Sequence, residues 1–149
     1  MKKPCAGTGL EARRVGIASP PERGYTASAY LARRASDCSA ALSWVAESAS
    51  DAAYRDVARL RLAGMQFDAK AYDDALKQLG AEFTPAMAGM ASDLRGDVLQ
   101  AKGQTPEAIA AYQQAWTQLA DVADYRRLVQ AKLNALGVDP QALAPESKK

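Results

Sequence analysis

The sequence contains no histidine, has only two cysteines among 149 residues, and carries a formal net charge of only +2. The absence of histidine removes the most common general base, the usual partner of a nucleophile in a catalytic triad and the usual zinc ligand. Two cysteines alone are too few soft ligands for a metal site. The small net charge gives no reason to expect nucleic acid as a partner. These deficits argue against several classes of enzyme, metalloprotein and nucleic-acid-binding protein.

Long apolar runs are also missing, and no segment reaches the length of about 20 apolar residues that a membrane span needs. Met1–Lys3 has the charge found at the start of a signal peptide, but no apolar segment follows it. We therefore expect the chain as written to be soluble. Cys5 and Cys38 are far apart in the sequence, and both free thiols and a disulfide between them remain open.

Alanine is abundant, apolar residues make up 48% of the sequence, and β-branched residues are sparse. This composition favours helices that pack through small side chains over sheets. The most informative segment is Leu94–Ala115. Small and apolar residues recur in its first part with a helical period, Gly103 ends that helix, and Thr105–Pro106 begins another. Two helices joined by so short a turn form an antiparallel hairpin.

Small residues stand where the two helices of this hairpin must approach each other closely. Gly96 lies on the first helix, Ala108 and Ala115 lie on the second, and we expect Tyr112 to fill the remaining gap. This order of residues is typical of a tetratricopeptide repeat (TPR), whose period is about 34 residues. The positions 33 residues before Gly96, Ala108 and Tyr112 are also small or apolar: Ala63, Ala75 and Leu79. The sequence therefore predicts two adjacent hairpins.

The predicted organisation is one helical domain between two irregular ends. We expect residues 1–24 to be a disordered or atypical segment, residues 25–137 to form the TPR-like domain, and residues 138–149 to be a flexible tail. Within the domain, Ser36–Asp37 is expected to end a short helix and cap a second one. A last helix over about Val122–Leu136 is expected to cap the stack with a polar outer face. The predicted fold class is all-α, a TPR-like stack of antiparallel helix hairpins (an α-α superhelix).

Paired carboxylates are the remaining candidates for chemistry. Asp73–Asp74 begins a predicted helix, where acidic residues favour the positive end of the helix dipole. Asp93 and Asp97 share one helical face and could hold a cation, but no further acidic ligand clusters with them, so we expect them to face solvent or a partner. Cys38 has no histidine to activate it. The sequence predicts no catalytic residue, metal, cofactor or small-molecule substrate, and therefore a binding protein rather than an enzyme.

A stack of hairpins presents a concave surface, which is lined by alternate turns of the first helix in each pair. The apolar members of that surface are also candidates for core packing against a neighbouring helix. An apolar patch flanked by acidic residues suits an extended, partly hydrophobic, basic segment of a partner protein. The predicted partner-binding residues are Val57, Leu60, Phe67, Asp68, Met90, Asp93, Asp97 and Gln100.

A series of segments between Ala40 and Gly137 follows one pattern along most of the chain. These segments are Ala41–Glu47, Ala58–Ala63, Lys70–Leu76, Asp93–Leu99, Ala101–Gly103, Ala111–Ala115 and Gln130–Gly137. In this order they resemble the TPR-like domain of the ancillary SecYEG translocon subunit family. The most specific part is Leu94–Asp97, because a generic TPR does not require arginine and aspartate around its glycine.

The resemblance implies a bacterial inner-membrane protein with one N-terminal transmembrane helix and a TPR-like domain in the periplasm. Members of that family associate with the SecYEG channel and with a membrane-anchored periplasmic chaperone of the prolyl-isomerase type. They are thought to help secreted or outer-membrane proteins emerge from the channel. The resemblance implies no catalytic residues and identifies no binding residues.

The sequence departs from that family before Ala40, where a segment rich in glycine, proline and arginine replaces the anchor and a further helical repeat. A truncated reading, a wrong start, a frame shift in the gene or an anchorless paralogue would each produce this departure. Two other roles remain open: a generic TPR scaffold in another envelope or cytoplasmic complex, and an outer-membrane lipoprotein assembly subunit. The second role needs a lipidated cysteine behind an apolar signal, and no apolar signal precedes Cys5.

Overall fold

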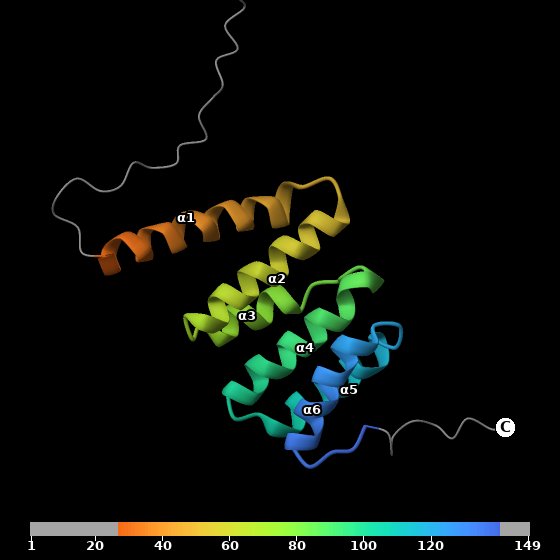
Figure 1. Ribbon diagram of the computed structural model, residues 1–149. Coiled ribbons are helices and arrows are strands. Elements are labelled where there is room, and N and C mark those ends of the chain that lie inside the picture. The colour runs from red at the N-terminus through yellow and green to blue at the C-terminus, as the bar shows by residue number, and fades with distance from the viewer. Residues whose placement is uncertain (1–26, 141–149) are drawn as a thin grey trace, which may run out of the picture. The chain divides into compact units, whose positions relative to one another are not determined.

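The computed structural model describes residues 27–140 and the side chains of residues 33–140, so the predictions for residues 1–24 and 141–149 lie outside it. This part is entirely helical and has no strand (Figure 1), which confirms the all-α prediction. No helix in it is long and apolar enough to cross a membrane. The helices are α1 (Ala27–Ser48), α2 (Ala52–Asp68), α3 (Tyr72–Leu79), α4 (Pro85–Ala101), α5 (Thr105–Gln118) and α6 (Ala123–Ala135). The chain divides into two units, residues 1–35 and 36–149, and apart from the start of α1 everything below belongs to the second.

One continuous helix, α1, replaces the two helices expected around Ser36–Asp37. Residues 27–48 contain no proline or glycine, so no residue that breaks a helix lies between its ends. The side chains of Ser36 and Asp37 are exposed, and water can satisfy them without a helix end at this point. The expected break was therefore wrong.

The two predicted hairpins are present as α2–α3 and α4–α5 (Figure 1), and both turn in the same way. Lys70 and Gly103, which are 33 positions apart, have left-handed φ angles of 61° and 79°. In the second turn the N–H of Gln104 donates to Leu99 O at 2.9 Å, and the first turn makes the equivalent bond at 2.8 Å. This Schellman arrangement satisfies a free carbonyl at the helix end. The turn thus recurs at the period found in the sequence.

Helix α6 ends with the same turn as α2 and α4. Gly137 has a φ angle of 78°, and the N–H of Val138 donates to Leu133 O at 3.0 Å. Gly137 follows Gly103 by 34 positions, which is the TPR period of about 34 residues. The turn that ends α6 is therefore the same as the turn that ends the first helix of each hairpin. In this respect α6 corresponds to a first helix, and it follows the second hairpin at the repeat period.

Small residues let the helices of the second hairpin pack closely, as predicted. Gly96 on α4 lies against the ring of Tyr112 on α5, where an added Cβ atom would overlap the ring carbons. Tyr112 has no exposed surface. Gly89 on α4 and Leu119, directly after the end of α5, repeat this relationship seven positions away from Gly96 and Tyr112. The structure confirms that Gly96 allows the close approach and that Tyr112 fills the space beside it.

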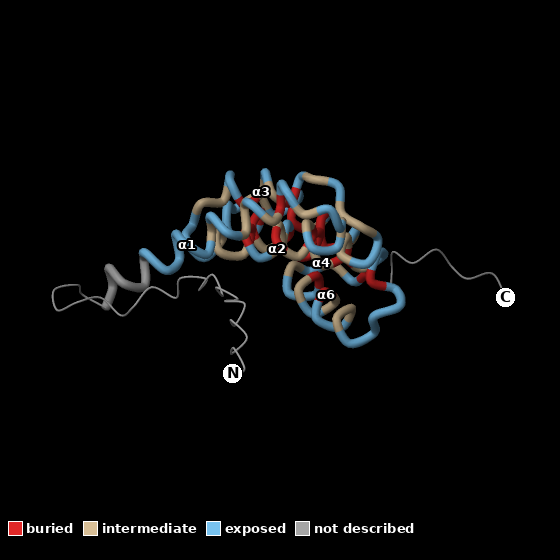
Figure 2. The backbone as a smooth tube through the Cα atoms, turned by 90° about the horizontal axis from the view of Figure 1, so that it is seen from above, coloured by how far each residue is buried: buried red, intermediate tan, exposed pale blue. Residues whose placement is uncertain are grey.

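Buried apolar residues form two clusters, and Figure 2 shows the buried positions gathered between the helices. The first cluster joins α2 and α3 to α4 and consists of Ala63, Ala75, Leu79, Ala91 and Val98. The second joins the end of α4 to α5 and α6 and consists of Leu99, Ala108, Ala111, Tyr112, Ala115, Leu119, Val129 and Leu133. Because α4 contributes to both clusters, the two hairpins pack as one stack.

Candidate functional site

A cluster of charged and phenolic side chains lies between α4, α5 and α6. Asp93 on α4 is buried, with 3% of its surface exposed. Lys132 on α6 donates to both carboxylate oxygens of Asp93, at 2.8 and 2.9 Å, and to the carboxylate of Asp97 at 2.8 Å. One ammonium group therefore joins two acids that stand four positions apart on the same face of α4.

Two tyrosine hydroxyls complete this cluster. Tyr112 on α5 donates to Asp97 at 2.7 Å, and Tyr125 on α6 donates to Asp93 at 3.0 Å. Burial, followed by the hydrogen bond to Asp97, raises the pKa of Tyr112 above the usual range of a phenol. Burial, followed by the negative charge of Asp93, raises the pKa of Tyr125 in the same direction. Both hydroxyls therefore remain protonated donors near neutral pH.

This arrangement is suited to holding helices together rather than to catalysis. Each carboxylate already accepts bonds from Lys132 and from a tyrosine hydroxyl. The raised pKa of each phenol disfavours its use as a base or a nucleophile. Removing Lys132 would leave the buried charge of Asp93 without a counter-ion, which is costly. The cluster thus connects α6 to α4.

The environment of Asp93 and Asp97 differs from the solvent-facing or partner-facing one that their spacing suggested. Lys132 and Tyr125 extend from α6 to these two acids. On the same helix, which was expected to present a polar outer face, the guanidinium of Arg126 packs 3.9 Å from the centre of the Trp116 ring on α5. Helical periodicity predicts which residues share a face of one helix. It does not predict which of these faces another helix will cover, so the environments of Asp93, Asp97 and Arg126 could not be predicted from it.

The other predicted partner-binding residues lie in different environments. Leu60 and Phe67 on α2 are half-buried and pack against the first apolar cluster. Substitution of either residue would therefore disturb the core as well as any surface. Of the remaining positions, Val57 and Met90 are half-buried. Asp68 and Gln100 are exposed.

The second carboxylate pair, Asp73–Asp74, lies in the first turn of α3, as expected. Asp73 accepts a hydrogen bond from Lys102 at 2.6 Å, while Asp74 accepts one from Lys77 at 2.9 Å. The bond from Lys102 holds the pKa of the Asp73 carboxyl below its usual value. The two acids thus have separate partners. Within residues 33–140, no group of three or more acidic or cysteine side chains is placed to hold a metal ion.

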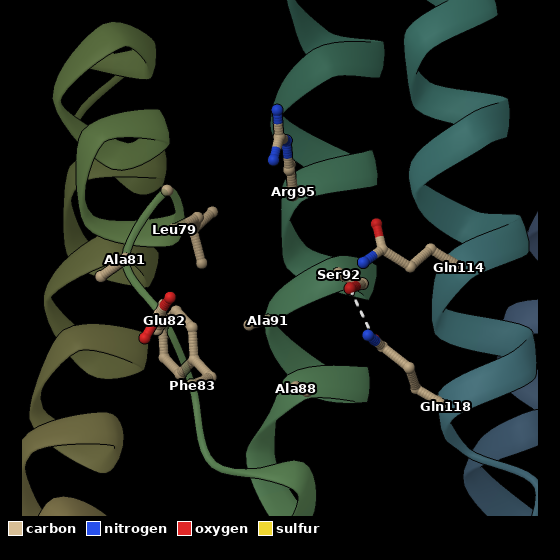
Figure 3. A pocket seen from close by; sticks show the side chains of 11 residues that line it. Leu79, Ala81, Glu82, Phe83, Ala88, Ala91, Ser92, Arg95, Gln114 and Gln118 are labelled. Atoms are coloured by element: carbon tan, nitrogen blue, oxygen red, sulfur yellow. Dashed lines mark hydrogen bonds between the residues drawn. The ribbon is translucent and has the colours of Figure 1, made fainter.

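A pocket of about 350 Å³ opens where the linker between α3 and α4 meets α4 and α5 (Figure 3). We call it the linker pocket. Its apolar lining includes Leu79, Phe83, Ala88 and Ala91, and its polar lining consists of Glu82, Ser92, Arg95, Gln114 and Gln118. A hydrogen bond of 2.8 Å joins the side chains of Ser92 and Gln118. Sequence periodicity did not single out this pocket, because one wall is a linker whose path no helical pattern predicts.

A second pocket, of about 570 Å³, lies between the end of α1, α2 and α3. We call it the α1 pocket. Its apolar lining is Ala46, Leu62 and Ala81, and its polar lining is Ser43, Glu47, Arg55, Arg59 and Gln78. Ala81 lines both pockets, so the two pockets adjoin at the linker between the hairpins.

A buried carboxylate holds this linker in place. Asp56 on α2 is 2% exposed and accepts a hydrogen bond from the backbone N–H of Thr84 at 2.8 Å. Arg59 lies 4.0 Å from the other carboxylate oxygen of Asp56. Thr84 directly precedes Pro85, the first residue of α4, so this bond connects the first hairpin to the second. In the 33-residue register Asp56 corresponds to Gly89, and the repeat pattern therefore gives no reason to expect an acid there.

The recurring left-handed turns, the close contact of glycine with tyrosine and the stacked hairpins define an α-helical repeat protein of the TPR type. The chain belongs to the tetratricopeptide repeat-like domain family, whose family model matches residues 25–138. No match was found among curated proteins or among solved structures. A domain of this type indicates a protein–protein interaction adaptor, and such domains are typically non-enzymatic scaffolds.

Proposed function

We propose that this chain is a non-enzymatic adaptor that binds partner proteins at the surface of its helical stack. The observation that carries the proposal is a contrast between interior and surface. The buried carboxylate of Asp56 accepts a bond from the α3–α4 linker, and that of Asp93 accepts bonds from α6. Arg95, by contrast, is exposed beside the linker pocket and has no hydrogen bond or ion pair within the described residues. Free polar groups on a rigid stack suit recognition of another protein.

We further propose that its partners are the SecYEG channel and a membrane-anchored periplasmic chaperone of the prolyl-isomerase type, at the periplasmic face of a bacterial inner membrane. The support is the segment Leu94–Asp97, which resembles the corresponding segment of ancillary SecYEG subunits. In this segment Gly96 contacts Tyr112 and Asp97 contacts Lys132, so folding accounts for both. Arg95 makes no bond within the described part of the fold, so folding does not explain why an arginine stands at this position. Contact with a partner protein would explain it.

Capture from detergent-solubilised bacterial membranes tests this proposal. The full chain serves as bait, and a Gly96→Leu chain, in which the Tyr112 ring blocks closure of the second hairpin, serves as the control. Mass spectrometry then identifies the captured proteins. We expect channel subunits and the chaperone with the native bait and not with the control.

The possible outcomes separate the two levels of the proposal. If the native bait, but not the control bait, captures proteins other than the channel and the chaperone, the chain is a generic TPR scaffold. The proposed role at the channel would then be wrong. Equal capture by the native and the control bait would show that binding does not use the fold. If the native bait captures nothing while its circular dichroism remains helical, the adaptor role itself is wrong.

A further inference from the structure

The repeat relates the linker pocket to the α1 pocket. Residues that line them from the first helix of each hairpin stand 33 positions apart: Arg55, Arg59 and Leu62 on α2, and Ala88, Ser92 and Arg95 on α4. Each pocket also has one acidic residue, Glu47 from the end of α1 or Glu82 from the α3–α4 linker, and a glutamine from the second helix of the hairpin, Gln78 or Gln114. These two pairs stand 35 and 36 positions apart, so they share chemistry but not the exact register. The stack therefore builds the same kind of pocket twice, and the two copies adjoin.

The arginines of the two pockets are used differently. Arg55 donates to two backbone carbonyls, at 2.7 and 3.0 Å, and Arg59 lies 4.0 Å from Asp56. Arg95 has neither a hydrogen bond nor an ion pair to any residue that the structure describes. Its side chain extends from the α4 wall of the linker pocket (Figure 3). Arg95 is therefore the arginine that remains available to an anionic group from outside.

The wall opposite Arg95 carries the opposite charge. Glu82 extends from the linker, and no ion pair joins it to Arg95 or to another residue in the described part of the chain (Figure 3). The buried apolar side chains of Leu79 and Ala91 line the same pocket. A ligand in the linker pocket would thus meet a positive wall, an apolar floor and a negative wall.

We infer that the adjoining pockets bind an extended segment of a partner protein, which places an acidic side chain against Arg95 and a basic side chain against Glu82. This inference rests on the proposed adaptor function and adds the site and the chemistry of the segment. The acidic and the basic side chain of the segment are inferred because their charges complement those of Arg95 and Glu82. The amide groups of Gln78 and Gln114 can donate to and accept from the backbone of such a segment, which has no internal bonds when extended.

The form of the pockets favours a polypeptide over a small ligand. Glu82, Arg95 and Gln114 are all exposed, so a small molecule would remain largely in water, whereas small-molecule sites bury most of their ligand. The pockets meet at Ala81, so an occupant can continue from one into the other. An extended chain advances about 3.3 Å per residue and presents side chains on alternate sides, which suits two neighbouring pockets of similar chemistry.

Selection from a peptide library tests the inference. Random peptides of about ten residues, displayed on phage, are selected on the immobilised full chain; extended peptides of this length span about 30 Å. The affinity of enriched peptides is then measured by fluorescence polarisation for the native chain, for Arg95→Glu and for Arg61→Glu. Arg61 is a matched control, because it is an exposed arginine of α2 without a bond in the described residues.

We expect the enriched peptides to contain an acidic residue and to lose affinity by about tenfold or more with Arg95→Glu, and by less than about twofold with Arg61→Glu. Replacing the peptide's acidic residue with lysine should restore binding to Arg95→Glu. Equal affinity for the native chain and Arg95→Glu would place the site elsewhere while the adaptor function stands. If the peptide selection fails but the membrane capture succeeds, the inference that the pockets bind an extended segment is wrong and the adaptor function stands. If both experiments fail, the adaptor function is wrong as well.

Discussion

Lys132 on α6 lies 2.8 Å from the buried carboxylate of Asp93 on α4, although the two residues are 39 positions apart. The same ammonium group reaches Asp97 on the next turn of α4. Because this buried ion pair joins α6 to α4 next to the second apolar cluster, it offers a measure of how firmly the last helix is held.

Replacing Lys132 with methionine should destabilise the fold. The substitution keeps most of the apolar stem but leaves Asp93 buried with only a tyrosine hydroxyl as a partner. We expect a loss of about 3 kcal/mol in the free energy of unfolding, measured by urea denaturation. The control is Arg127→Met, which removes an exposed ion pair with Asp124 and should have almost no effect. Similar losses in the two variants would contradict a structural role for the buried pair.

Two glycines in helix interiors should respond to alanine in opposite directions. At Gly96 an added Cβ overlaps the Tyr112 ring, so Gly96→Ala should destabilise the chain by about 1–3 kcal/mol. At Gly64 no atom lies within 4 Å of an added Cβ, so Gly64→Ala should stabilise it by about 0.5–1 kcal/mol through helix propensity. Thermal unfolding followed by circular dichroism measures both. The same sign for the two variants would argue against the close contact of α4 with α5.

Replacing Lys70 with glycine should stabilise the fold. Among the described residues it is the one non-glycine with a positive φ angle, 61°, at the position where the second hairpin has Gly103. An L-residue pays a steric cost in this conformation that glycine avoids, so Lys70→Gly should raise the free energy of unfolding by about 0.5–1 kcal/mol. The reverse change, Gly103→Lys, should lower it by a similar amount. A destabilised Lys70→Gly chain would show that the lysine side chain contributes more than the turn costs.

The raised pKa values of Tyr112 and Tyr125 predict a loss of stability at high pH. In the unfolded chain a tyrosine ionises with a pKa near 10, whereas in the fold both phenols keep their protons at higher pH. The folded state therefore binds more protons above pH about 10, so their contribution is fully present below that pH and falls as pH rises further. Urea unfolding measured from neutral to alkaline pH should show this decline.

The matched control for the alkaline decline is the double variant Tyr112→Phe, Tyr125→Phe. It removes the buried phenol of Tyr112 and the half-buried phenol of Tyr125 while the other tyrosines of the chain remain, so its stability should depend less steeply on pH above about 10. A slope identical to that of the native chain would assign the decline to other groups, such as the lysines that also lose charge in this range.

Much of the fold could be predicted from the sequence because its signals are local. Gly103 and Thr105–Pro106 mark a turn through their backbone preferences, and the structure has a turn there. Gly96 and Tyr112 were identified as a close contact because the order of small and aromatic residues in this hairpin is typical of a TPR unit. The local signal failed at Ser36–Asp37, since residues that favour a helix start are also tolerated inside an exposed helix.

The candidate site was less predictable. The spacing of Asp93 and Asp97 placed both acids on one face of a helix, which is correct, but did not reveal that Lys132 and Tyr125 would reach them from α6. Leu60 and Phe67 were predicted as surface residues with core packing left open, and the structure places them against the first apolar cluster.

Local residue preferences account for most of the helices, their turns and the 33-residue register, because backbone preference and side-chain size act over a few neighbouring residues. Long-range packing accounts for which polar groups are engaged inside the stack and which remain free on its surface. Asp93 acquires its partner from 39 positions away, while Arg95, two positions further along α4, acquires none among the described residues. That difference depends on how α6 and the α3–α4 linker pack against α4, and packing over such distances is not encoded in any local pattern.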